Sequence, residues 1–334
     1  MSLSLGNTTI GSIYLGSTKI GQAYLGNVKV YPSGDPYNPL NLPPYTIRLK
    51  FTDGVTPYIS KGTAVQVSSS PNVWDLTYEN SDWSYLLEER NSLIEVLGAN
   101  TSSVTTMEGM FLNSQWLTSV PLFDTSSVTD MSNMFTETAL TSVPLFDTSN
   151  VTDMMSMFGG CRSLTSVPLL NTSSVTNMGG MFNTCQSLTT VPLFDTSSVI
   201  YMGTMFRNCT SLTSVPLFDT SSVTNMVSMF EGCGLLTAVP LFDTSLVTGM
   251  VSMCRYCRSL TAVPLFDTSS VDSIQYMFDG CYNVASGSYA LYQQASSQST
   301  PPTYYTDCFK NCGRDTVAGA AELAQIPASW GGLG

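Results

Sequence analysis

One stretch of 24 residues recurs along the middle of the chain and constrains its fold more than any other feature. Each copy reads close to L-T-S-V-P-L-F-D-T-S-S-V-T-x-M-x-x-M-F-x-x-C-x-S, as in residues 188–211. A proline marks each copy at a spacing of 23 to 24 residues, namely Pro121, Pro144, Pro168, Pro192, Pro216, Pro240 and Pro264. This period is typical of solenoids, whose units bury their apolar sides only against the next unit. We therefore expect a repeat solenoid over residues 100–283.

The apolar positions within one copy predict a short strand followed by a short helix. Leu164, Val167 and Leu169 have the spacing of a strand whose Leu and Val side chains point inward. From Val175 to Phe182, apolar residues fall at i, i+3, i+6 and i+7, which is one stripe of a helix. We expect each unit, or rung, to contain a strand, a tight turn, a short helix and a return loop.

This repeat signature resembles the leucine-rich repeats of BspA-like surface proteins, and the resemblance extends over about residues 100–283. It implies a stack of strand-and-helix units. The proline in every rung removes one amide donor from the strand. We therefore expect strands of two or three residues and an imperfect sheet.

The composition argues against an enzyme and against a nucleic-acid partner. The chain has no histidine, the residue most used for proton transfer and for metal binding. Its net charge is −12 and the repeats hold only four basic residues, whereas a phosphate-binding surface needs a basic patch. Neither a signal peptide nor a membrane-spanning run is evident, so we expect no membrane insertion. We also expect no cofactor and no metal.

A row of carboxylates recurs at one position of the repeat, and it has two interpretations. Stacked oxygens could bind calcium. Alternatively, each carboxylate accepts amide hydrogens from the Thr-Ser-Ser that follows, as an Asx-turn or a helix cap. Asn100 and Asn171 occupy the same row, and an amide can cap but brings no charge to a cation, which favours the cap. The carboxylates are Asp124, Asp147, Asp195, Asp219, Asp243 and Asp267.

The cysteines also follow the repeat, which favours a buried column of reduced thiols. Residues 308–312 copy residues 205–209, so we expect a degenerate last rung there, in which Cys308 replaces a core Met. Cys254 replaces a core Phe, and its C-x-x-C spacing to Cys257 follows from the register. Parallel Cβ vectors disfavour disulfides, and zinc would need other ligands. The regular column is Cys161, Cys185, Cys209, Cys233, Cys257, Cys281 and Cys312.

Charges of alternating sign stand two residues before successive cysteines of this column. Residues at one repeat position are neighbours in space, so opposite charges should pair from rung to rung. We expect this row to fix rung register and not to bind a charged ligand. The residues are Arg207, Glu231, Arg255, Asp279 and Lys310.

The first 31 residues contain a different repeat, of ten residues, with Leu-Gly at each start. Alternating apolar residues broken by Gly-Ser or Gly-Asn predict a β-meander with two-residue turns. So small a ribbon cannot bury its apolar face alone, so we expect it to be an anchor completed by a partner. Residues 32–44 are rich in proline and predict a semi-rigid linker. The candidate anchor contacts are Leu5, Ile13, Tyr14, Leu15, Tyr24, Leu25 and Tyr31.

The two flanks of the repeat predict caps that seal its open ends. In residues 45–99, we expect strands at Thr46–Phe51 and near Ala64–Val67, with the aromatic residues at 74, 78, 83 and 85 covering the first rung. In residues 284–334, we expect a helical turn at 289–294 and a short helix at 317–325. The candidate ligand contacts lie in or beside this second cap: Tyr282, Tyr289, Tyr292, Tyr304 and Tyr305.

The opening L-G-x-x-K-I-G-x-x-Y-L-G and the closing A-A-E-L-A-Q-I-P-A-S-W-G-G resemble segments of virion appendage proteins of phages that infect gut bacteria. This resemblance implies a non-enzymatic tail or head fibre located in the virion, held to other virion proteins through residues 1–31. Its rod would project toward a host-surface glycan or protein. We also expect a homo-oligomer, with a trimer as one option. The alternative is a BspA-like adhesin on a bacterial cell surface.

Overall fold

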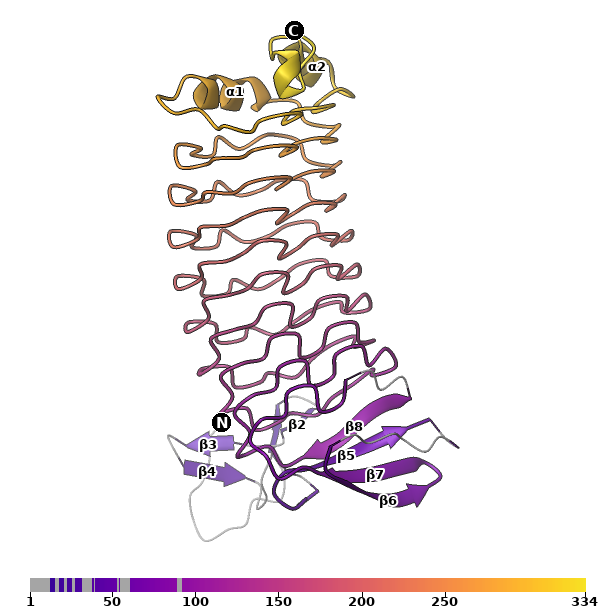
Figure 1. Cartoon of the computed structure of the whole chain (residues 1–334). Coiled ribbons are helices and arrows are strands. Elements are labelled where there is room, and N and C mark those ends of the chain that lie inside the picture. Colours follow the sequence, from indigo (N-terminus) through magenta and orange to yellow (C-terminus); the bar gives the residue numbers. More distant parts are fainter. Residues whose placement is uncertain are drawn as a thin grey trace.

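The repeats of this protein stack into one column, with a small sheet at one end and helices at the other (Figure 1). The structure is a computed structural model, and it describes residues 38, 40–52, 54, 61–88 and 92–334 together with the backbone of four short strands before them. Single parallel bridges join equivalent residues of successive rungs, and we name each rung by its bridging residue. The bridging residues are Asp82, Thr106, Asp130, Asp153, Asn177, Tyr201, Asn225, Gly249, Ser273 and Tyr304.

The expected helix in each rung is wrong, because the backbone donors of that segment point to the next rung. The N–H of Met178 donates to the carbonyl of Tyr201 at 3.0 Å, and the N–H of Phe182 donates to Met205 at 2.9 Å. An α-helix would use these donors within its own segment, four residues back. Within residues 92–283, all of which the structure describes, no α-helix forms. The segment expected to form the strand makes few β-bridges between rungs. Most hydrogen bonds between rungs come from the segment that was expected to form the helix.

Successive four-residue turns produce the same apolar spacing that suggested a helix. The N–H of Met181 donates to the carbonyl of Met178 at 3.2 Å, three residues back. The third residue of this turn, Gly180, has φ +62°, and Thr184 has φ +64° in the next turn of the rung. Such turns place every third or fourth side chain inward, as a helix does. The periodicity therefore identified the buried residues correctly and the backbone incorrectly.

Identical side chains stack on one another through the core of the column. The rings of Phe158, Phe182 and Phe206 follow one another at centroid distances of 5.7 Å. Buried threonines add a polar row, in which the hydroxyl of Thr196 donates to the backbone carbonyl of Asp219 at 2.7 Å. Most rungs repeat these contacts, with Cys254 replacing the phenylalanine in one of them, so the core continues along the whole column.

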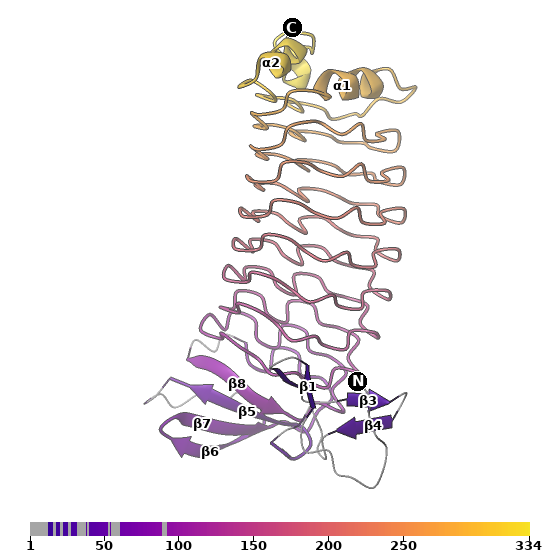
Figure 2. The same cartoon turned by 180° about the vertical axis from the view of Figure 1, so that it is seen from behind.

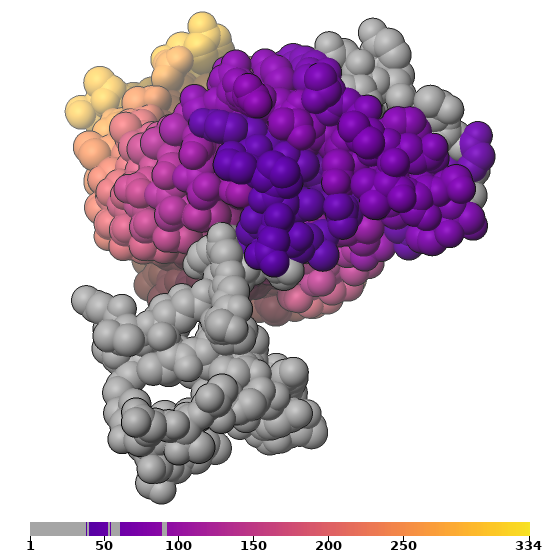
Figure 3. Space-filling view, turned by 90° about the horizontal axis from the view of Figure 1, so that it is seen from below, coloured from indigo at the N-terminus to yellow at the C-terminus, as the bar shows by residue number. Residues whose placement is uncertain are grey.

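The N-terminal cap is an antiparallel sheet whose last strand also begins the column. The strands in spatial order are β6 (Thr63–Ser69), β7 (Asn72–Thr77), β5 (Thr46–Phe51) and β8 (Leu93–Ala99). The expected strands at Thr46–Phe51 and near Ala64–Val67 are confirmed. Glu95 of β8 forms a parallel bridge with Ser119 of the first regular rung. Seen from below, the sheet covers this end of the column (Figure 3).

The column begins earlier in the chain than residue 100. Asp82 bridges Thr106, and the buried Trp83 takes the position that methionine holds in later rungs. Leu86 and Leu87 follow at the positions of the second methionine and the phenylalanine. The N–H of Leu87 donates to Met110 at 2.9 Å, as in every later rung. An aromatic residue expected to cover the first rung is therefore part of a rung.

The expected N-terminal β-meander is observed as two separate hairpins. β1 (Ile13–Leu15) pairs with β2 (Thr18–Ile20), and β3 (Ala23–Leu25) pairs with β4 (Val28–Tyr31), both antiparallel. Two residues connect the strands of each hairpin, as expected from Gly-Ser and Gly-Asn. Among the strands that the structure describes, β2 and β3 are not paired. Of the candidate anchor residues, six lie in β1, β3 and β4, and Leu5 lies outside the described residues.

Two short helices and a further rung close the C-terminal end (Figure 2). The helices are α1 (Ser288–Ser296), α2 (Val317–Leu323) and the 3₁₀ turn η1 (Ala328–Trp330). The degenerate last rung is confirmed, because Phe278 donates its N–H to Cys308 at 2.8 Å. The carboxylate of Glu322 in α2 accepts hydrogen bonds from the N–H of Gly287, the hydroxyl of Ser288 and the N–H of Tyr289 at 2.7–3.3 Å. This side chain caps the start of α1, which has no cap of its own.

Candidate functional site

The cysteine column consists of buried free thiols, as expected, and six of these thiols donate to a backbone carbonyl. All nine cysteines are free and buried. The Sγ of Cys209 donates to the carbonyl of Phe182 at 3.0 Å, and Cys185, Cys233 and Cys257 make the same bond 27 residues back. Burial raises the pKa of Cys209 to about 12, so the thiol stays protonated at neutral pH. The column therefore stabilises the rungs and offers no nucleophile.

The aspartate row forms Asx-turns, which confirms the expected capping role without a helix to cap. The Oδ1 of Asp195 accepts the N–H of Ser197 at 3.1 Å and its hydroxyl at 2.7 Å. The same bonds to Ser221 lower the pKa of Asp219, so this carboxylate is ionised at neutral pH. No three His, Cys, Asp or Glu side chains are grouped to hold a metal ion in the part of the chain that the structure describes.

The alternating charge row pairs in part as expected. Arg207 contacts Glu231 at 2.9 Å, and Arg255 contacts Asp279 at 3.0 Å. The last member departs from the expectation, because Lys310 forms its ion pair with Asp307, 2.9 Å away in its own rung. The carboxylate three residues back is closer along the chain than the one in the neighbouring rung, which Arg255 already contacts.

Three of the five candidate tyrosines meet at the C-terminal end, and two lie elsewhere. The ring of Tyr292 packs edge-on against the indole of Trp330 with a centroid distance of 5.2 Å, and the ring of Tyr305 stacks on the same indole at 4.4 Å. The ring centroids of Tyr289 and Tyr292 are 6.1 Å apart. These three rings are partly buried against the core. Tyr282 lies under the guanidinium of Arg314 at 4.1 Å, and Tyr304 is exposed at the last bridge of the ladder.

A row of exposed leucines runs along the column and was not expected from the sequence. Leu169 was expected to point inward, and this is wrong, because it is 60% exposed. The N–H of Leu170 donates to the carbonyl of Pro168 at 3.0 Å, which closes a three-residue turn with Leu169 at its corner. The equivalent leucines are between 52% and 62% exposed, and we call them the leucine row: Leu145, Leu169, Leu193, Leu217, Leu241 and Leu265.

The aspartate row borders the leucine row along much of its length. In each of five rungs an exposed aspartate follows the exposed leucine by two residues, as in Leu193 and Asp195, and a buried phenylalanine lies between them. The column therefore presents an apolar strip with aspartate side chains on one side. Contiguous exposed apolar surfaces larger than a few hundred Å² are uncommon on monomeric proteins that have no binding partner.

One rung of the column is a residue short, and a recess lies at that point. In the Thr106 rung, residues 114–117 close a turn by the bond from the N–H of Leu117 to Ser114 at 3.0 Å. In the Asp153 rung, the N–H of Leu164 closes the same turn by donating to the carbonyl of Cys161 at 3.1 Å. The Asp130 rung between them has only Ala139 between Thr138 and Leu140, so it lacks the residue needed for this turn. This deletion explains the single 23-residue spacing of the prolines.

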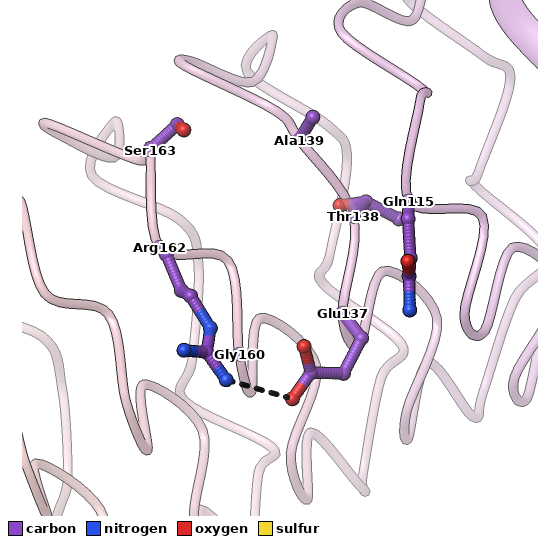
Figure 4. A pocket seen from close by; sticks show the side chains of 7 residues that line it. All are labelled: Gln115, Glu137, Thr138, Ala139, Gly160, Arg162 and Ser163. Atoms are coloured by element: carbon purple, nitrogen blue, oxygen red, sulfur yellow. Dashed lines mark ion pairs between the residues drawn. The ribbon is translucent and has the colours of Figure 1, made fainter.

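The recess has a volume of about 390 Å³ and is lined by residues of three rungs. Figure 4 shows Arg162 and Glu137 reaching toward each other from neighbouring rungs, with a distance of 4.0 Å between Nη2 and Oε1. The floor includes Thr138, whose hydroxyl donates to the carbonyl of Phe135 at 2.9 Å. The complete lining is Gln115, Glu137, Thr138, Ala139, Gly160, Arg162 and Ser163. The signal for this site, the 23-residue spacing, was visible in the sequence.

These features define a stacked repeat protein, and its repeats match a known family model. The model is described as "Mycoplasma protein of unknown function, DUF285", and it matches residues 82–190, 137–235 and 213–294. These overlapping matches cover more than half of the chain, so the chain belongs to this family. The first match begins at the residue where the hydrogen-bonded column begins. No curated protein matches the chain.

Several solved structures are similar to parts of the chain. A leucine-rich repeat protein of Eubacterium ventriosum is 20% identical with a TM-score of 0.35, and the match covers 44% of this chain and 41% of that one. A leucine-rich cell surface protein of Faecalibacterium prausnitzii is 23% identical with a TM-score of 0.38, over 59% of this chain and 62% of that one. A leucine-rich repeat protein of Bacteroides ovatus is 16% identical with a TM-score of 0.23, over 75% and 83%. The chain thus spans less than two thirds of the first two proteins.

The described part of the chain holds no helix of the length and apolar character needed to cross a membrane.

Proposed function

We propose that this chain is a non-enzymatic adhesion protein of a bacterial cell surface, and that its column is a BspA-like leucine-rich-repeat solenoid. The leucine row carries this proposal. A leucine at the corner of a turn does not fill the core, so folding alone does not require an apolar residue there in six successive rungs. An exposed apolar strip of this length is typical of a protein contact surface.

The partner that fits the row is a protein with an apolar strip bordered by basic side chains. Burying all six leucines fully would contribute roughly 5–10 kcal/mol, whereas association costs at least about 4 kcal/mol in lost freedom. The leucines alone therefore support weak binding. The aspartates beside them favour a basic rim on the partner, and this complementarity raises the association rate. A second copy of this chain would bring like charges, which disfavours it as the occupant.

The test is adhesion by a non-adherent bacterium that displays the full chain. Binding to epithelial monolayers and to surfaces coated with host matrix proteins is compared for the wild type and for Leu193→Ser with Leu217→Ser. The matched control is Leu235→Ser with Leu246→Ser, because these leucines are 51% and 54% exposed and lie outside the row. We expect the row variant to lose most adhesion, the control to retain it, and salt to weaken it. Equal adhesion by both variants would refute the role of the row.

The oligomeric state distinguishes a partner protein from self-association. Light scattering of the purified chain should give a mass that does not depend on the leucine row. A dimer or trimer that dissociates when Leu193 and Leu217 become serine would assign the row to a second copy of the chain.

A virion appendage is the second candidate function, and the resemblance of the opening and closing segments favours it. On this alternative, residues 1–31 hold the chain to other virion proteins and the column reaches a host glycan or protein. None of the matches reported above is to a virion protein. Mass spectrometry of purified phage particles decides between the two, because the adhesin proposal requires that the chain be absent from them.

A further inference from the structure

The recess at the Asp130 rung breaks the uniformity of the column, and its side chains differ from those of the other rungs. From the Asp153 rung to the Ser273 rung, the edge of the column repeats a closed turn after each residue of the thiol column. Here the missing residue leaves a gap between the turns of the rungs on either side, at Gln115 and at Ser163. Because the backbone is withdrawn, the recess is built into the rung and does not depend on the rotamer of one side chain.

The recess combines hydrogen-bonding groups of both kinds with no net charge. Arg162 offers only donors, Glu137 offers only acceptors, and the amide of Gln115 offers both. The ion pair of Arg162 and Glu137 is loose at 4.0 Å, and these side chains are 60% and 40% exposed. Their donors and acceptors are therefore available to a ligand that enters between them.

The residue next to Gln115 in the chain carries an exposed indole. Trp116 follows Gln115 in the turn that borders the recess, and it is 65% exposed. Of the four tryptophans, Trp83 and Trp330 are buried and Trp74 packs against the core. A tryptophan side chain presents a large, rigid apolar face, and tryptophan and arginine dominate binding hot spots.

We propose that this recess binds a neutral saccharide, one ring of which stacks on Trp116 while its hydroxyls contact Arg162, Glu137 and Gln115. Adjacent hydroxyl groups can accept from the planar guanidinium and donate to the carboxylate at the same time. The C–H face of the sugar ring supplies the apolar surface that an indole contacts. A volume of about 390 Å³ has room for a small ligand and lies at the lower end of the usual range.

The charges of the recess argue against the other ligand classes. A phosphate or a carboxylate would meet Glu137, and a cation would meet Arg162, each about 4 Å from the opposite charge. A purely apolar ligand would leave these groups without the hydrogen bonds that water gives them. A neutral molecule rich in hydroxyl groups satisfies both.

The first experiment presents the full chain to a glycan array that carries neutral oligosaccharides of glucose, galactose, mannose and N-acetylglucosamine, and acidic ones as comparison. The strongest neutral probe is then titrated by calorimetry against the wild type and its variants. We expect Trp116→Ala and Arg162→Gln each to weaken binding by about tenfold or more. The matched control is Arg258→Gln, since Arg258 is exposed at the same turn position but follows a rung of normal length.

The second experiment refills the recess. Inserting a serine between Thr138 and Ala139 restores the usual rung length, so the turn can close over the recess. We expect this variant to melt at or above the temperature of the wild type and to lose saccharide binding. If it fails to fold, the two point variants decide, because both change exposed side chains.

The results separate this proposal, which rests on the proposed adhesion role, from that role itself. No binding of any neutral probe, binding of acidic probes alone, or unchanged affinity in Trp116→Ala and Arg162→Gln would overturn the saccharide site. Saccharide binding that persists in the Leu193→Ser, Leu217→Ser variant would show that the recess acts independently of the leucine row. Loss of adhesion by that variant would still support the row if the recess failed.

Discussion

Replacing Cys209 by serine should destabilise the protein less than replacing it by alanine. The Sγ of Cys209 donates to the carbonyl of Phe182, and the same carbonyl also accepts the N–H of Cys185 at 3.0 Å. Alanine removes the thiol donor and leaves a small void, but the carbonyl keeps one partner. We therefore expect a loss of about 1–2 kcal/mol in the free energy of unfolding.

Serine keeps the donor, and the chain already contains this arrangement. Ser114 holds the same column position, is fully buried, and donates its hydroxyl to the carbonyl of Leu87 at 2.9 Å. We therefore expect Cys209→Ser to cost less than about 1 kcal/mol. At a core position without an acceptor the order would be reversed, since a buried hydroxyl without a partner is costly.

The assay is urea unfolding followed by circular dichroism, with the midpoint and the slope compared for the three proteins. An unchanged slope is needed, because long repeat proteins can lose two-state behaviour. Reductant should leave the wild-type midpoint unchanged, since the thiols are free. A serine variant less stable than the alanine variant would refute the hydrogen-bonding role of the column.

Three further predictions test other contacts. A double-mutant cycle on Arg207→Glu and Glu231→Lys should give a coupling free energy of several tenths of a kcal/mol in unfolding, and salt should reduce it because the pair is partly exposed. A coupling of zero would mean that the 2.9 Å ion pair does not contribute to stability. Glu322→Gln should cost about 1–2 kcal/mol in thermal unfolding, since its carboxylate caps α1; an unchanged melting temperature would contradict that role. The hydrogen bond to Glu108 raises the pKa of Tyr85 to about 12. The stability that this bond contributes is therefore complete below pH 10 and is lost as the pH rises toward 12. Tyr85→Phe should reduce the loss of stability at alkaline pH, and a pH profile identical to that of the wild type would refute the role of the bond.

The sequence predicted the stack and the buried residues well, because both follow from the repeat. The apolar positions of the rung from Val175 to Cys185 are all buried, and the thiols lie in one column. The backbone path was predicted poorly. Consecutive turns and an α-helix both bring residues three and four apart to one face, so the periodicity of apolar residues does not distinguish them. The left-handed residues that allow the turns, such as Thr184, give little signal in the sequence.

The candidate sites illustrate a second limit. The leucine row was assigned to the core because leucine in a repeat is usually buried, and the turn formed by Pro168 and Leu170 reverses its direction. The recess arises because one residue is missing from the repeat, and a search for recurring residues does not reveal a deletion. The exposed indole at position 116 lies in a rung of normal length, in the turn that precedes the shortened rung.

The shortened rung marks a unique position in a column whose other rungs are nearly equivalent. Since the junctions between the Asp153 and Ser273 rungs repeat the same pattern of backbone bonds, adding or removing a whole 24-residue unit there would leave each neighbour matched, and the length of the column could change without a new fold. The Asp130 rung is not interchangeable in this way, because its recess needs a longer rung on each side. A chain that gains or loses units on the C-terminal side of this rung would therefore keep its recess at a fixed distance from the N-terminal sheet, while the C-terminal end moves.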